Sequence, residues 1–301
     1  MSAVRFELDP AAPPAEEVRR LAIAGVDDAR ARLEGGGEPF GEAVHEARKR
    51  LKEVRAVLRL ARRGMRKGEA KAAQTALRDS GRRLAPVRDA EVVLATLDRL
   101  RGPDDLVAGF RSELLEDLDR ARADIGSPEV VEAALAGLRA IREAAPSWRL
   151  DVDAEVLTDG VARTHRTGRK ALAATLAAPG DDEALHEWRK RVKDSWYHLL
   201  LLRAAWRPTI GALADEAHVI SEALGTDHDL VVLEARFTGR RSEVGDEEAA
   251  ELARRLEAAR EPLRERALAV GRRLYATPAV NHARLLAGWW RVTVDEVGQG
   301  T

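Results

Sequence analysis

Apolar residues recur along most of the chain at spacings of three and four, which is the period of an amphipathic α-helix rather than of a strand. Val44, Ala47 and Leu51, for example, return to one side of a helix. Pro and Gly interrupt this pattern and divide it into helical stretches. The pattern predicts helices over about 14–34, 41–63, 68–100, 104–124, 128–144, 153–177, 182–206, 209–239, 246–275 and 278–291.

The predicted helices form two sets with matching layouts. The segment HEARKRLK, which starts at His45, returns in altered form as HEWRKRVK at His186. A second pair follows in the same order, because LAPVRDAEVVL in the first half resembles LGTDHDLVVL in the second. Matched segments in matched order indicate duplication. We therefore predict an all-α fold of two pseudo-symmetric bundles of long antiparallel helices, in residues 1–148 and 149–301.

Composition agrees with a helical protein. Charged residues make up 34% of the 301 residues and aromatic residues only 4%, as is typical of long amphipathic helices. The absence of cysteine excludes disulfides and thiolate chemistry, and fits a reducing compartment. The most apolar run, 197–206, contains His198 and Arg203, and the N-terminus has no apolar run of signal-peptide length. We expect a soluble, cytoplasmic protein without a membrane span.

The formal net charge is only -1, so a cationic surface requires an uneven distribution of charge. The helix predicted to begin near residue 41 is strongly basic, and spacings of three, four and seven place its cations in a row on one side. This row consists of His45, Arg48, Lys49, Lys52, Arg55 and Arg59. The shorter row of the second half consists of His186, Arg189, Lys190 and Lys193, with Arg166, Arg169 and Lys170 as further candidates on the preceding helix.

Rows of Arg and Lys suit a chain of phosphates, because Arg binds pairs of oxyanions and Lys supplies an adjustable point charge. Many weak contacts along one polymer add up through high effective concentration. The structural alternative is a solvated helix face that pairs with acidic residues of neighbouring helices. The presence of the row in both halves favours a polyanion-binding surface, and a nucleic-acid backbone remains an alternative ligand.

Histidines mark both repeated segments. His45 and His186 begin the basic rows, and Arg88 and His228 occupy matching positions in the second pair of segments. Two roles stay open for these histidines, as neutral hydrogen-bond donors to phosphate or as buried links between helices. The sequence contains no HxxxH or HExxH pair, no phosphate loop and no recognisable catalytic carboxylates or serine. We therefore predict no metal, no cofactor and no enzymatic activity, with a metal-dependent phosphohydrolase as the catalytic alternative.

The segments HEARKRLKEVRAVLRLAR and HEWRKRVKDSWYHLLLLR, each followed by its partner segment described above, resemble the CHAD family of histidine-marked α-helical domains. The resemblance extends from about Phe6 to Trp290. It implies two four-helix bundles whose basic faces line a shared groove or central opening, binding of inorganic polyphosphate by the residues named above, and association with intracellular polyphosphate granules. Many relatives also carry a triphosphate-hydrolysing β-tunnel domain. The sequence has no alternating-strand region of that kind, so we expect a stand-alone binding module.

Overall fold

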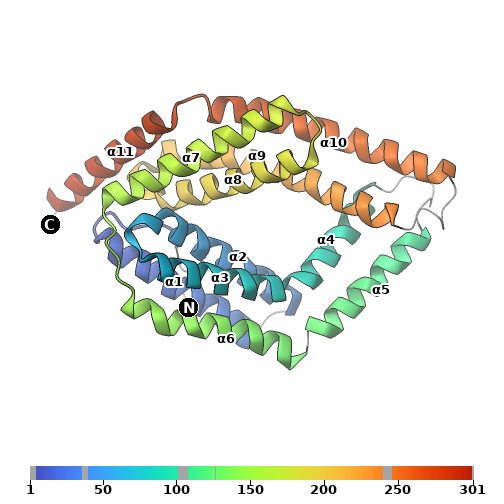
Figure 1. The fold of residues 1–301 in the computed structure, drawn as a ribbon, viewed down its shortest axis with the longest axis horizontal. Helices are drawn as coiled ribbons and strands as arrows, with labels where there is room; N and C mark the ends of the chain where they lie inside the picture. Colours follow the sequence, from blue (N-terminus) through green and yellow to red (C-terminus); the bar gives the residue numbers. More distant parts are fainter. Residues whose placement is uncertain (1–4, 36–39, 101–107, 126, 240–245, 300–301) are drawn as a thin grey trace.

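The computed structural model describes residues 5–35, 40–100, 108–125, 127–239 and 246–299, and Figure 1 shows their arrangement. Within these ranges the chain is helical and contains no strand, which confirms the all-α prediction. The helices are α1 (Pro14–Glu34), α2 (Phe40–Leu60), α3 (Lys67–Arg83), α4 (Ala85–Leu100), α5 (Ala108–Ile125), α6 (Pro128–Ala144), α7 (Ala154–Ala177), α8 (Asp182–Leu201), α9 (Arg207–Thr238), α10 (Asp246–Leu274) and α11 (Ala279–Gln299). Short 3-10 turns follow α2 (η1, Arg62–Gly64), α6 (η2, Ala145–Ser147) and α8 (η3, Arg203–Ala205).

The prediction of one helix over 68–100 is wrong, because this stretch forms α3 and α4 with a break at Leu84. Pro86 explains the break. It lies in the first turn of α4, where a proline is tolerated, whereas inside a longer helix its ring would clash with the carbonyl group four residues earlier. The matching segment of the second half lies within the uninterrupted helix α9.

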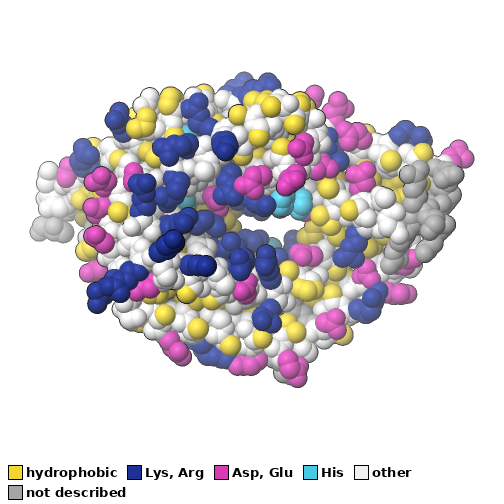
Figure 2. Space-filling model, viewed as in Figure 1, with side chains coloured by type: hydrophobic (Ala, Val, Ile, Leu, Met, Phe, Trp, Pro, Cys, Tyr) yellow, Lys and Arg dark blue, Asp and Glu magenta, His cyan; other side chains and the backbone are white. Residues whose placement is uncertain are grey.

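Two clusters of buried apolar side chains join the first half of the chain to the second. One connects α1 and α2, through residues such as Leu21 and Leu60, to α7, α8, α9 and α11. The other connects α4 and α5 to α9 and α10, and includes an edge-to-face contact between Phe110 and Phe237 with ring centroids 5.4 Å apart. Figure 2 shows an opening through the molecule, and the helices of these clusters meet on either side of it (Figure 1).

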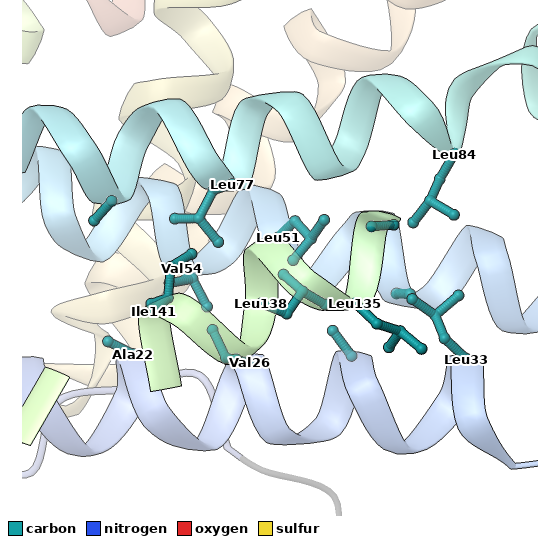
Figure 3. Packing of buried hydrophobic residues seen from close by; sticks show 14 of the residues in the cluster. Ala22, Val26, Leu33, Leu51, Val54, Leu77, Leu84, Leu135, Leu138 and Ile141 are labelled. Carbon is teal, nitrogen blue, oxygen red and sulfur yellow. The ribbon is translucent and has the colours of Figure 1, made fainter. Parts of the chain in front are cut away.

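Two further clusters lie within the halves. The first fills the space between α1, α2, α3 and α6, where Val26, Leu51 and Leu138 pack together (Figure 3). The second lies among α7, α8, α9 and α10 around Trp188, whose side chain is fully buried. The division into two bundles, 1–148 and 149–301, stays a prediction. Two of the four clusters lie within one half each, and the other two are shared by both halves.

The C-terminal end of α2 is fixed against α7 at a glycine. A Cβ atom at Gly160 would overlap the backbone oxygen of Leu60 and lie 2.8 Å from its Cδ1 atom. One turn later, the guanidinium group of Arg163 donates a hydrogen bond of 2.9 Å to the backbone oxygen of Arg59. This bond satisfies one of the carbonyl groups that the end of a helix leaves without a partner. The close contact therefore aligns α7 with the end of α2.

We expect the substitution Gly160→Ala to lower the free energy of unfolding by roughly 1–3 kcal/mol, because the added methyl group forces α7 away from α2. Gly288→Ala is the matched control, since a Cβ atom at this position in α11 meets no atom within 4 Å. There the substitution should be neutral or stabilise the protein by up to about 1 kcal/mol, as alanine favours helix. Urea unfolding of the three proteins measures both effects, and equal stability of Gly160→Ala and the wild type would contradict the packing described here.

Candidate functional site

A cavity of about 1540 Å³ occupies the opening between the two halves. Its walls come from α2, η1, α3 and α4 on one side and from α8 and α9 on the other. Sixteen Lys and Arg residues line it, against four Asp and Glu residues. The whole chain carries a formal net charge of -1, so this one space concentrates positive charge that acidic residues elsewhere balance.

The structure brings most of the predicted site residues into this lining. From the first half these are His45, Arg48, Lys49, Lys52, Arg55, Arg59 and Arg88, and from the second Arg189, Lys190, Lys193 and His228. The two basic rows thus lie on opposite walls of the same space. Sequence periodicity placed each row on one side of its helix, but only the packing of α2 near α8 makes the rows face each other.

Two lysines that are equivalent in the repeats both have lowered pKa values in the cavity. The pKa of Lys52 is lowered to about 8, mainly by burial between the walls and also by Arg48 and Arg189. The pKa of Lys193 is likewise lowered to about 8 by burial, by Arg189 and by Lys52 itself. Both side chains keep contact with solvent because the cavity is open. Each of these lysines is therefore charged at pH 7 but only partly charged above pH 8.

Hydrogen bonds and an ion pair hold the arginines of the α2 row in place. Arg48 donates a bond of 3.1 Å to the backbone oxygen of Leu84, at the junction of α3 and α4. Arg59 pairs across the two halves with Asp194 of α8, with 2.7 Å between Nη2 and Oδ1. The pKa of Asp194 is raised by burial, while the charge of Arg59 acts in the opposite direction. These contacts order the long side chains before any ligand arrives.

Arg55 and Gln74 hold each other between α2 and α3. The Arg55 Nε atom donates a bond of 3.3 Å to Gln74 Oε1, and Gln74 Nε2 donates a bond of 2.8 Å to the backbone oxygen of Arg55. A neutral partner leaves the full charge of the guanidinium group available to the cavity.

The rings of His186 and His228, the two histidines that mark the repeats in the second half, lie against each other. The rings of His186 and His228 lie 4.3 Å apart and are tilted by 31°. His228 lines the cavity, whereas His186 lies outside the lining and joins α8 to α9 through this contact. Burial, followed by the charge of Arg189, lowers the pKa of His228 to about 4, and burial also lowers the pKa of His186. At neutral pH both rings are uncharged, so the pair links two helices and presents a neutral ring to the cavity.

His45 of the first half is exposed on α2 beside the cavity. Burial against its helix neighbours is the main cause of its lowered pKa, and the charge of Arg88 adds to this effect. His45 is therefore a neutral group at the edge of a cationic surface.

Sequence reasoning missed the wall that α3 provides. Lys67, Lys71 and Arg78 line the cavity together with Gln74 and Thr75. Their spacing of four and seven residues places them on one side of α3, so the periodic signal was present. What the sequence did not reveal is that this side turns toward the second half. The other cations of the lining that were not predicted are Arg62, Arg99, Arg191 and Arg236.

The structure places Arg166, Arg169 and Lys170 outside the cavity lining, although the sequence grouped them with the α8 row. The physical reason is the orientation of α7. Its buried side, which includes Val161 and Leu172, packs into the apolar clusters, so Arg166 and Lys170 are exposed to solvent.

Among the residues that the structure describes, no group of three or more Asp, Glu or His side chains is arranged so that it could hold a metal ion. Among the helices that the structure describes, none is long and apolar enough to cross a membrane.

Comparison with known proteins gives the family. The model of the CHAD domain family matches residues 20–238, which is well over half of the chain and includes all four repeated segments. The crystal structure of the CHAD domain from the plant Ricinus communis is similar in fold, with a TM-score of 0.62 and 19% sequence identity over 92% of this chain and 96% of that chain. No curated protein matches the chain. Since the family model covers both basic rows and both of their partner segments, the chain belongs to the CHAD domain family.

Proposed function

We propose that this protein binds inorganic polyphosphate as a linear chain lying in the cavity, without hydrolysing it, and that this binding attaches the protein to polyphosphate granules in the cytoplasm. The observation that carries the proposal is the excess of sixteen cationic over four acidic residues in one lining. The sequence resemblance to CHAD domains implies the same ligand.

The positions of the cations suit a flexible chain with closely spaced negative charges. Cations approach from both walls, so that successive phosphates are contacted on both sides. Arginines held by Leu84, Gln74 and Asp194 lose little side-chain freedom on binding, which lowers the cost of association. Release of counterions from the polymer adds a favourable contribution that weakens with salt.

Binding also relieves repulsion between cations of the two walls. Burial is the main cause of the lowered pKa values of Lys52 and Lys193, and the charge of Arg189 on α8 lowers both of them further, across the cavity in the case of Lys52. A phosphate chain between them replaces this repulsion with attraction. Neutral His45 and His228 at the same surface add hydrogen bonds without adding further repulsion.

Replacing Arg48, Lys49, Arg189 and Lys190 by Gln together should weaken binding of long-chain polyphosphate by about tenfold or more at physiological salt. The slope of log affinity against log salt should also become shallower by about 3, as expected when four phosphate contacts are lost. Fluorescence titrations at several salt concentrations measure both quantities.

A control with the same change in net charge replaces Arg120, Arg139, Arg254 and Arg291 by Gln, on α5, α6, α10 and α11 outside the lining. This control should bind like the wild type. If the cavity variant and this control bind long-chain polyphosphate with equal affinity, the proposal is wrong. Incubation of the wild type with long-chain polyphosphate and Mg²⁺ should leave the chain length unchanged, and release of phosphate would instead support the hydrolase alternative.

Affinity for polyphosphate should fall as the pH rises from 7 to 9. Phosphate favours the charged form of Lys52 and Lys193 and raises their pKa above 8, so binding near pH 8 takes up protons. Calorimetry in buffers with different ionisation enthalpies measures this uptake. The double variant Lys52→Met, Lys193→Met should show a flatter pH profile and less proton uptake, and an unchanged profile would exclude these lysines as its cause.

Without ligand, Lys52→Met should raise the free energy of unfolding by about 0.5–2 kcal/mol at pH 7, because it removes a crowded charge from a binding site. The native pKa of about 8 lies below the value of about 10.4 for an unfolded lysine. Between these values the unfolded state binds more protons, so the cost of Lys52 to the native state shrinks and the wild type becomes more stable as pH rises. The difference in the free energy of unfolding between Lys52→Met and the wild type should therefore become smaller above pH 8. Lys170→Met, outside the lining, serves as the control and should change stability by less than about 0.5 kcal/mol.

A further inference from the structure

The exposed side of α7 carries cations without acidic partners. Within the described residues, Arg166, Arg169 and Lys170 form no ion pair with a carboxylate. Exposed arginines elsewhere commonly do so, as in the pairs Arg142–Asp27 and Arg254–Glu251. In a chain with 50 basic and 51 acidic residues, three neighbouring cations without a counter-charge are a surface that favours an anion.

This surface is connected to the cavity through η1. Arg62 lies in η1 and lines the cavity, and η1 contacts α7. On α7, Arg163 donates its hydrogen bond to the backbone of Arg59, another residue of the lining. The close approach at Gly160 fixes these two parts of the chain together.

The charges along this connection are close enough to act on one another. The pKa of Arg163 is lowered by burial first, and then by the charges of Arg62, Arg63 and Arg166. The charge of Asp159 acts in the opposite direction on the pKa of Arg163, and Asp159 pairs with Arg63. From Arg163 to Lys170 the helix advances by roughly 10 Å, at about 1.5 Å per residue. In Figure 2, Lys and Arg side chains gather beside the opening and continue over the part of the face where α7 lies in Figure 1.

We propose that Arg166, Arg169 and Lys170 on the outer side of α7 form a second binding segment for the same linear phosphate polymer, occupied where the chain leaves the cavity past η1. This inference rests on the proposed function of the cavity. It makes the length of the ligand decisive, because a short chain contacts the cavity alone, whereas a long chain contacts both segments at once.

The test compares tripolyphosphate with long-chain polyphosphate on the variant Arg166→Gln, Arg169→Gln, Lys170→Gln. We expect its affinity for the long chain to fall about tenfold and the salt slope to become shallower by about 2, since three phosphate contacts are lost. Its affinity for tripolyphosphate should equal that of the wild type. The control variant Arg120→Gln, Arg139→Gln, Arg254→Gln carries the same change in net charge on α5, α6 and α10, and should bind both ligands normally.

The outcomes separate this inference from the proposal on which it rests. Unchanged long-chain affinity in the α7 variant overturns the second segment but leaves the cavity intact as a site. An equal loss for both ligands also overturns it, because these residues would then affect the cavity itself. Failure of the wild type to bind either ligand would overturn the proposed function. Urea unfolding of the α7 variant verifies that it folds, as expected for exposed positions such as Arg166 and Lys170.

Discussion

Mutual repulsion of the two cationic walls is the constraint around which this fold is built. The rows on α2 and α8 face each other, and charges of the opposite wall lower the pKa values of both lysines, Arg189 that of Lys52 and Lys52 that of Lys193. Two apolar clusters resist this repulsion, one on each side of the opening. Apolar burial stabilises by about 25 cal/mol per Å² and does not depend on charge, so it holds the walls together whether or not a ligand is present. The Arg59–Asp194 pair adds one direct electrostatic link between the halves.

The same constraint accounts for the near-neutral composition of the chain. Acidic residues are kept mostly away from the lining, where they hold other arginines. Arg260, for example, is buried and pairs with Asp227 at 3.0 Å between α9 and α10. A protein can therefore have a net charge of -1 and still present a strongly positive cavity. The net charge of the chain therefore does not reveal the cationic cavity, which depends on how basic and acidic residues are distributed between the cavity and the outer surface.

Periodicity in the sequence was sufficient for most of the helices and for the side of the helix on which each basic row lies, since these depend on spacing within one helix. It did not show the break at Leu84 that divides the predicted helix over 68–100. Periodicity could not predict which helix faces line the cavity, because this depends on how the helices pack against one another. The α3 wall with Lys71 and Arg78 was missed because nothing local indicates which partner α3 faces. The α7 cations were grouped with the cavity for the same reason. Gly160 shows what decides their position, because its lack of a side chain sets how closely α7 approaches the end of α2, and hence which side of α7 is exposed.

Duplication has given this protein two unequal walls rather than two equivalent sites. The first half contributes eleven of the sixteen cations in the lining and the second contributes five. Where the first half has the charged Arg88, the second has His228, which is neutral at pH 7. Because of this asymmetry the electrostatic field has no exact two-fold symmetry, and the two walls of the cavity present different charges. Where η1 contacts α7, the charge of Arg62 in the lining acts on Arg163. On the proposal of a second binding segment, a long polyanion in the cavity extends past η1 to the cations of α7.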